Sequence, residues 1–402
     1  MAMILSRRSF TRNAPLFGAL GLSALGGDDA RAATEHAPAL PASMGVILPM
    51  TGRLGLAGDE IWRGVALAYA ALPQEQRPGL LRVPAESTRA VQRAVGVLRA
   101  KGAAMILGTG SSTLSFAATE SAELANIAYL ELDASADGIT KRGFRSLHRF
   151  GTTSADAAAK VAAAVSQVIT PGWHQTPQQV RIGVMFDIGA TDGAFAAAML
   201  RALAAAHMTP VLTIATATGR ADLDQPVRRM RRAKLDLVIH AAQPDGAALF
   251  YQAMARANWR PRMVVGTGAG YALDTLTALI GAGFDRTMVV ASPAYGAAAA
   301  AIERAYYRRY AMMPRGAASL QAYLGARVAF RALAASNAQK TPLASLSATV
   351  IPVGKLANGW GVQFDHDGQN TRSFCQLQQW QSGVLRPIEP GQPGAVAPIL
   401  AF

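Results

Sequence analysis

The sequence predicts an α/β protein built on parallel sheets. Short apolar runs of strand length alternate with stretches of helical periodicity from residue 44 onward. This alternation is typical of parallel strands joined by right-handed helical crossovers. The chain is 51% hydrophobic and 16% charged, so it can bury large cores. Its 402 residues are enough for two domains.

The elements follow one another in a regular order. The first predicted strand, residues 44–48, ends at Pro49, and a Gly-rich turn leads into apolar residues at helical spacing over 59–67. Val91, Val95 and Leu98 mark one face of the next helix. Further strands are predicted, with helical stretches between nearly every pair, at residues 104–107, 128–132, 182–186, 211–214, 237–240, 263–265 and 288–290.

The first 33 residues have the parts of a secretory signal. The pair Arg7-Arg8 precedes a weakly apolar run, 14–26, and Ala30-Arg31-Ala32 resembles a signal-peptidase site. The apolar run is shorter than the roughly 20 residues that cross a bilayer. We therefore predict a twin-arginine signal peptide at 1–32, export to the periplasm and no stable membrane insertion after its removal. A basic, disordered start of a cytoplasmic protein is the alternative.

Charge and cysteine content narrow the function. A formal charge of +14 can indicate nucleic acid or an anionic membrane as a partner. The basic residues are spread out, however, and we interpret the one dense cluster, 228–234, as a solvated helix face. Predicted export argues further against nucleic acid as a partner.

Cys375 is the only cysteine in the sequence, which excludes an intramolecular disulfide. We predict that Cys375 is a small core residue, and that the protein has no lipid anchor.

Ligands of parallel α/β sheets bind beyond the carboxyl ends of the strands. Several of the segments at those positions are rich in Gly or Ser, which permits close approach of the backbone to a ligand. The segments to consider are 49–59, 108–112, 133–135, 187–193, 241–245 and 266–271.

Four motifs, taken in order, carry a resemblance to a known family. They are Gly-Val-Ile-Leu-Pro-Met-Thr-Gly at 45–52, Leu-Gly-Thr-Gly-Ser-Ser at 107–112, Asp-Ala-Ser at 133–135 and Phe-Asp-His-Asp-Gly at 364–368. This order resembles the type I periplasmic solute-binding proteins, in particular the branched-chain amino-acid (Leu/Ile/Val) binding family of ABC transporters.

The resemblance implies two doubly wound parallel-sheet lobes, joined by three crossing segments, with a ligand cleft between them. It places the N-terminal lobe at 42–153 plus 293–346, the C-terminal lobe at 154–292 plus 347–386, and an irregular tail at 387–402. It also implies the substrate-binding protein of an ABC importer, with a small-molecule ligand and a permease as partners. A non-transport envelope sensor, or a protein that binds another protein, is the alternative on the same fold.

In the amino-acid binders of this family, hydroxyls and backbone amides of the second and third turns hold the ligand carboxylate. The matching positions here are Ser112 and Ser135, with Ser111 and Ala134 as neighbouring candidates. A serine hydroxyl and exposed N–H groups in a turn can satisfy an anion without a counter-charge. The alternative is that these serines only cap the following helices.

This sequence departs from the family pattern at the positions that contact the ligand beyond its carboxylate. The acidic partner of a ligand ammonium is missing from 266–271, where Gly268 and Tyr271 lie, and the aromatic residues expected after Asp187 and near Gln243 are also missing. We therefore expect a carboxylate- or amide-bearing solute that is not a standard branched-chain amino acid. Asp133 could take over a cation or only cap a turn. Tyr271 could supply a wall or a hydroxyl.

No motif indicates catalysis. The six histidines lack metal-binding spacing, and we interpret His240 as a core histidine rather than a cleft residue. There is no G-x-S-x-G elbow, and 108–113 lacks the Gly-Lys-Ser/Thr ending of a nucleotide-binding loop. We expect no cofactor, no metal and no enzyme activity.

Overall fold

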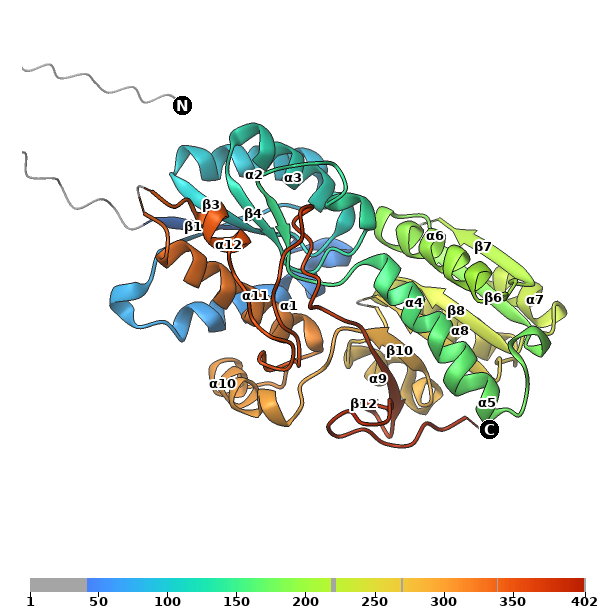
Figure 1. Cartoon of the computed structure of the whole chain (residues 1–402). Helices are drawn as coiled ribbons and strands as arrows, with labels where there is room; N and C mark the ends of the chain where they lie inside the picture. Colours follow the sequence, from blue (N-terminus) through green and yellow to red (C-terminus); the bar gives the residue numbers. More distant parts are fainter. Residues whose placement is uncertain (1–41, 218–221, 269, 338, 401–402) are drawn as a thin grey trace, which may run out of the picture. The chain divides into compact units, whose positions relative to one another are not determined.

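The computed structural model describes residues 42–217, 222–268, 270–337 and 339–400. The predicted signal peptide at 1–32 therefore lies outside the described residues. Two separate sheets organise the described part of the chain, one of five strands and one of seven (Figure 1). The α/β class with parallel sheets predicted from the sequence is confirmed.

The first sheet consists of five parallel strands from the N-terminal part of the chain. Alternate strand residues face opposite sides of this sheet. Met105 and Leu107 join one core cluster, whereas Ile106 between them joins another. Both faces are therefore covered, as in a doubly wound sheet. The strand order is β2 (Gly79–Pro84), β1 (Ser43–Leu48), β3 (Ala103–Gly108), β4 (Ala128–Glu131) and β5 (Leu147–Arg149).

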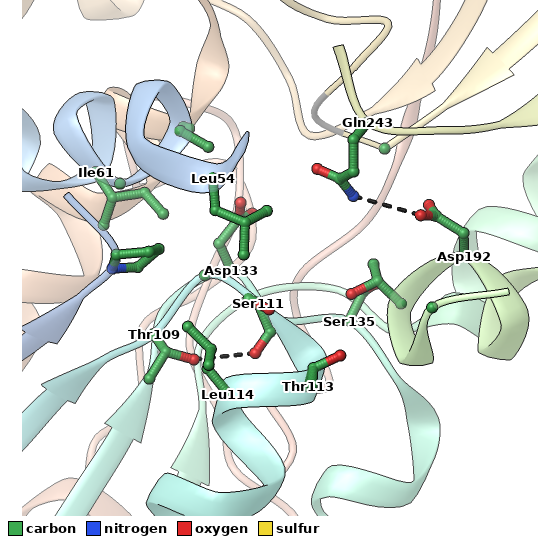
Figure 2. A pocket seen from close by; sticks show the side chains of 18 of the residues that line it. Leu54, Ile61, Thr109, Ser111, Thr113, Leu114, Asp133, Ser135, Asp192 and Gln243 are labelled. Carbon is green, nitrogen blue, oxygen red and sulfur yellow. Dashed lines mark hydrogen bonds between the residues drawn. The ribbon is translucent and has the colours of Figure 1, made fainter. Parts of the chain in front are cut away.

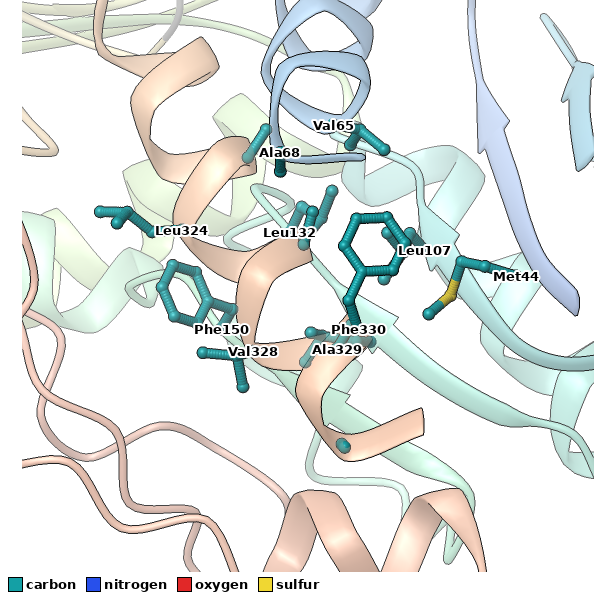
Figure 3. Close-up of a cluster of buried hydrophobic side chains, with 14 of the residues drawn as sticks. Met44, Val65, Ala68, Leu107, Leu132, Phe150, Leu324, Val328, Ala329 and Phe330 are labelled. Carbon is teal, nitrogen blue, oxygen red and sulfur yellow. The ribbon is translucent and has the colours of Figure 1, made fainter. Parts of the chain in front are cut away.

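Four long helices cover this sheet. α2 (Thr88–Ala100) and α3 (Ser112–Ala125) pack together on one face. α1 (Gly55–Ala70) and α11 (Ala317–Ala334) pack together on the other face. Figure 3 shows Phe330 of α11 among side chains of α1 and of the strands. A segment remote in sequence thus completes the core of the first sheet.

The second sheet has seven strands. At one edge, β11 is antiparallel to β10, and β12 is antiparallel to β11. It is also doubly wound: Leu237 and Ile239 join the core cluster beneath α4 and α6, and Val238 joins the cluster beneath α7 and α8. The strand order is β12 (Val384–Pro387), β11 (Gln376–Gln381), β10 (Met288–Ala291), β9 (Met263–Thr267), β8 (Leu237–Ala241), β6 (Ile182–Asp187) and β7 (Leu212–Thr216). The helices of this part are α4 (Ser154–Ala164), α5 (Thr170–Gly172), α6 (Ala190–Ala205), α7 (Asp224–Arg232), α8 (Pro244–Arg256) and α9 (Thr275–Ile280).

The chain passes three times between the two sheets. It leaves the first sheet after β5, returns after β10 to α10 (Ala300–Tyr310), and leaves again after α12 (Pro342–Ser347) to form β11. We call the sheet of β1–β5 with its helices the first lobe, and the sheet of β6–β12 with its helices the second lobe. The residue-level lobe boundaries expected from the resemblance stay a prediction.

The predicted strands agree with the observed ones to within two residues at either end. The pattern missed β2, β5 and the antiparallel pair β11 and β12. β2 lies at the edge of its sheet and is only half-buried, so it lacks a continuous apolar run, and β5 has three residues. Cys375 is buried in the second lobe, as expected for a small core residue. In the described part of the chain, no helix is long and apolar enough to span a bilayer.

The contact between α1 and α11 leads to a first prediction. A Cβ built on Gly64 would lie 2.1 Å from the carbonyl oxygen of Ser319, whereas one built on the exposed Gly96 of α2 would meet nothing within 4 Å. Gly64→Ala should therefore lower the free energy of unfolding by about 1–3 kcal/mol. Gly96→Ala should raise it by about 0.5–1 kcal/mol through helix propensity. Urea unfolding followed by circular dichroism measures both, and equal effects would contradict close packing at Gly64.

Candidate functional site

A cavity of about 590 Å³ lies between the two lobes. The first lobe lines it with the turn after β1, the turn after β3 and the turn after β4, and the second lobe with residues that follow β6, β8 and β9. These are the carboxyl ends of the strands, where the sequence predicts ligand binding. Figure 2 shows side chains of both lobes in this cavity, including Ser111, Asp133 and Ser135 from the first and Asp192 and Gln243 from the second.

Much of the cavity wall is apolar. None of the described lining residues is aromatic. Aliphatic side chains favour a ligand with a hydrocarbon body, because its burial contributes about 25 cal/mol per Å² of apolar surface. The aliphatic lining residues are Leu54, Ala57, Ile61, Leu114, Ala157, Ala190, Ala272, Leu273, Val290, Ala291, Ala317 and Ala318.

Hydroxyl groups from the first lobe supply neutral hydrogen-bonding capacity. Ser111, Thr113 and Ser135 all line the cavity (Figure 2). Ser111 occupies the N-cap position of α3, but its side chain makes no capping hydrogen bond there. The alternative role of Ser111 as a helix cap is therefore wrong in this structure. The Ser135 hydroxyl receives only a long contact, 3.5 Å, from the Ser154 hydroxyl.

Ser112 is placed differently from Ser111. It is fully buried and does not line the cavity. Its Oγ accepts a hydrogen bond of 3.1 Å from the backbone N–H of Ala136, and its own N–H donates to Thr191 Oγ1 at 3.2 Å. Ser112 thus links the second turn to the third and to the other lobe, and the ligand contact expected for it is absent from this geometry.

The sequence analysis missed Glu131, the last residue of β4. Its side chain is fully buried behind the cavity wall. The carboxylate accepts hydrogen bonds from the backbone N–H groups of Thr109 (2.8 Å), Gly110 (3.1 Å), Leu132 (3.0 Å), Asp133 (3.2 Å) and Ala134 (3.0 Å), and from the Ser115 hydroxyl (2.7 Å). These backbone amides of the turns after β3 and β4 therefore already have a hydrogen-bond acceptor within the chain. Ala134 is buried behind the wall for the same reason.

Three acidic side chains line the cavity: Glu86, Asp133 and Asp192. Asp133 follows β4 and Asp192 lies in the first turn of α6, where it is 4% exposed. Burial raises the pKa of each of these two aspartates to about 7, assisted by the charge of Glu131 for Asp133 and by that of Asp187 for Asp192. Gln243 lines the cavity and donates from Nε2 to Asp192 at 3.4 Å.

An ion pair joins the two lobes beside the cavity. Arg53, in the turn after β1, contacts Asp245 of α8 through Nε at 2.5 Å and through a terminal nitrogen at 2.7 Å. The same guanidinium lies 3.6 Å from Asp187 at the end of β6. Asp187 is buried and outside the cavity lining, so it contacts Arg53 rather than the cavity. Arg53 is the one basic side chain among the described lining residues.

The loop after β9 differs from its expected role. Gly268 lines the cavity, but Tyr271 is fully buried behind it and packs against Gly266. Its hydroxyl is hydrogen-bonded to His240 Nδ1, and its carbonyl accepts from Trp380. Tyr271 is therefore a core residue here, and the wall or hydroxyl expected from it is not present. His240 is the buried core histidine predicted, and burial lowers its pKa to about 3.

The basic cluster at 228–234, on α7 and the turn that follows it, lies away from the cavity lining. Arg228, Arg229, Arg231, Arg232 and Lys234 are all exposed. Met230 between them is fully buried. The cluster is therefore the solvated face of an amphipathic helix, as the sequence predicts.

Comparison with known proteins gives one family. Residues 82–383 match the family described as periplasmic binding protein. Leu/Ile/Val-binding protein homolog 7 of Brucella suis is 29% identical over 378 residues, which are 88% of this chain and 94% of the relative. Homolog 8 of Brucella abortus is 28% identical over 361 residues, 86% of this chain and 90% of the relative.

Solved structures share the fold. A leucine-binding protein from Thermotoga maritima has a TM-score of 0.74 at 15% identity, and the likeness covers 86% of this chain and 97% of that one. An ABC-transporter solute-binding protein from R. palustris in complex with benzoate has a TM-score of 0.74 at 17% identity, covering 90% and 99%.

Glu131 leads to a prediction with a chemical test. Glu131→Ala removes an acetate-sized group and leaves several buried N–H donors unpaired, which should cost about 3–5 kcal/mol of unfolding free energy. Acetate at 100 mM should restore part of the loss, seen as a higher melting temperature than in NaCl of equal ionic strength. The original chain should show no such difference, and equal acetate effects on both proteins would contradict this role.

Asp192 gives a prediction for pH dependence. Its pKa is about 7 in the folded protein and near 3.8 in the unfolded chain, so its contribution to stability is present at low pH and is lost as pH rises through 7. Asp192→Asn removes this loss. The variant should therefore gain about 1–3 kcal/mol in unfolding free energy relative to the original between pH 5 and pH 8. A difference that does not change with pH would show that Asp192 is ionised in both states.

Proposed function

Because the chain belongs to the periplasmic binding protein family, we propose that it is the substrate-binding protein of an ABC importer. It captures a small organic solute between its two lobes and presents the closed form to the permease. The solute leaves as it entered, with no bond made or broken. The twin-arginine signal predicted at 1–32 would deliver the chain to the periplasm.

The observation that carries this proposal is the cavity itself. Turns at the carboxyl ends of strands in both lobes line it, so a bound solute contacts both lobes at once. Such a solute favours the closed arrangement over the open one by the contacts that exist only when the lobes meet. Structural relatives are solved with isoleucine, with benzoate and with 4-hydroxybenzoate, which are solutes of the size this cavity admits.

The residues that line the cavity limit the classes of solute that it can bind. An aliphatic lining with hydroxyls at Ser111 and Ser135 favours an apolar body with one hydrogen-bonding end. The carboxylate- or amide-bearing solute expected from the resemblance stays a prediction, and Glu131 already occupies most of the turn amides that would hold a carboxylate. The loop around Gly268 offers no acidic side chain for an amino-acid ammonium.

A ligand panel tests the proposed function. The purified chain is screened by thermal shift against amino acids, amides, amines, alcohols and carboxylic acids. A ligand at 100 times its dissociation constant adds about 2.7 kcal/mol of stability, so a true ligand is easily seen. Ser135→Ala should weaken its binding several-fold. No shift with any class would reject solute binding and favour a non-transport protein that binds another protein.

Lobe closure has its own test, and it includes an internal control. Arg53→Ala breaks an ion pair between the lobes, whereas Arg256→Ala breaks an ion pair of similar length, 2.6 Å to Asp224, within the second lobe. Both pairs are partly exposed, so neither loss should unfold the chain. Only Arg53→Ala should increase the radius of gyration of the ligand-free chain in X-ray scattering and weaken ligand binding about two- to five-fold. The same change in both variants would show that the Arg53 ion pair has no specific role in lobe closure.

A further inference from the structure

Within the proposed function, the charges of the cavity point to one class of solute. The chain as a whole carries a formal charge of +14, yet the cavity lining is acidic. Its described acidic and basic side chains are Arg53, Glu86, Asp133 and Asp192, one base and three acids. The ionisable groups that face a solute are therefore mainly acidic, although the protein as a whole is positively charged.

The one cation is already engaged. The Arg53 guanidinium contacts both oxygens of Asp245, at 2.5 and 2.7 Å, and lies 3.6 Å from Asp187. A solute carboxylate would have to displace Asp245 from Arg53 to gain this partner. The solute would replace one carboxylate partner of Arg53 by another in a partly exposed pair, so the exchange gains little and Arg53 is a weak anchor for an anion.

The backbone donors of the wall are engaged as well. Glu131 accepts from the N–H groups of Thr109 and Gly110 in the second turn and of Asp133 and Ala134 in the third. Its own negative charge lies immediately behind these turns. An anionic solute in the cavity would meet that charge without the N–H groups that could offset it.

The two aspartates that line the cavity, Asp192 buried and Asp133 half-buried, have few partners. Asp192 is 4% exposed, and its one side-chain hydrogen-bond partner among the described residues is Gln243 Nε2 at 3.4 Å, a long hydrogen bond to a neutral group. Asp133 faces the same cavity from the first lobe, with neutral Gln321 as its side-chain neighbour. Carboxylates in a cavity are stabilised chiefly by a cation or by several donors. Among the described residues Asp133 has neither, and the cation whose charge acts on Asp192 is Arg53, which is already paired with Asp245.

We propose that the cavity takes a solute with an aliphatic or aromatic body and a protonated amine as its polar end, recognised by Asp133 and Asp192. The amine supplies the positive charge and the N–H donors that these carboxylates lack. Because the two acids belong to different lobes, an amine that contacts both also stabilises lobe closure. A carboxylate at the same place would be repelled by both.

Matched probes test the proposal by calorimetry on the purified full chain at pH 7.5. One set is benzylamine, benzyl alcohol and benzoate, and the other is 3-methylbutylamine, 3-methylbutanol and 3-methylbutanoate, with leucine added. Within each set only the polar end changes. The amine should bind at least tenfold more tightly than the alcohol, and the carboxylate should bind least. A carboxylate that binds as tightly as its matched amine overturns the proposal.

Isosteric variants assign the contact. Asp133→Asn and Asp192→Asn should each lower amine affinity at least tenfold and change alcohol affinity by less than threefold. Glu75→Gln removes an exposed carboxylate outside the cavity and should change neither. Equal losses for amine and alcohol would mean that the two acids are structural, and the proposal would fail.

The two levels of inference fail in different ways. Binding of carboxylic acids, amides or alcohols in preference to amines would overturn the amine assignment and leave the binding function intact. No binding by any class, in a chain whose melting curve shows it to be folded, would overturn the binding function and the amine assignment together.

Discussion

The geometry of the cavity wall depends on the carboxylate of Glu131. Removing a carboxylate from water costs several kcal/mol, and this cost is offset only when its oxygens accept enough hydrogen bonds. Glu131 accepts from backbone N–H groups of two separate turns and from Ser115 on α3. It therefore fixes the turn after β3 against the turn after β4. The same bonds satisfy amides that would otherwise be buried unpaired, so the first-lobe wall is complete without a ligand.

This internal carboxylate changes which groups are left for recognition. With most of the turn amides engaged, the polar contacts available from the first lobe are side chains, which include the hydroxyls of Ser111, Thr113 and Ser135 and the carboxyl of Asp133. The second lobe adds Asp192 and Gln243. Discrimination among solutes then rests on charge and on the number of donors that a solute offers. A site built on side chains rather than on backbone amides can change its preferred ligand by single substitutions, while the turns keep their shape.

Periodicity was sufficient to predict the parallel α/β class, whereas the two-lobe arrangement was expected from the family resemblance. Neither predicts whether a single side chain points inward or outward. Most inner strands are buried on two faces and therefore form short apolar runs, and β2, β5, β11 and β12, which lack such runs, were missed. Ser111 and Ser112 are adjacent and chemically identical, yet one lines the cavity and the other bonds to Ala136. Tyr271 turns into the core because Gly266 leaves room for its ring. Glu131 could have been noticed as the one acid within an apolar strand, but its partners come from turns that only the fold brings together.

The energies of the lobe contacts show why a ligand is needed to control closure. The pair formed by Arg53 and Asp245 is partly exposed, and such pairs contribute about 0.5–1 kcal/mol. The hydrogen bond from the Ser112 N–H to Thr191 adds a contribution of about 1 kcal/mol. Moving a two-state equilibrium from 1:99 to 99:1 requires about 5.5 kcal/mol. These two contacts alone fall short of this, so they can bias the equilibrium but cannot set it. The remainder has to come from groups that a solute contacts in both lobes, and Asp133 and Asp192 are the cavity groups with the most interaction energy still to gain.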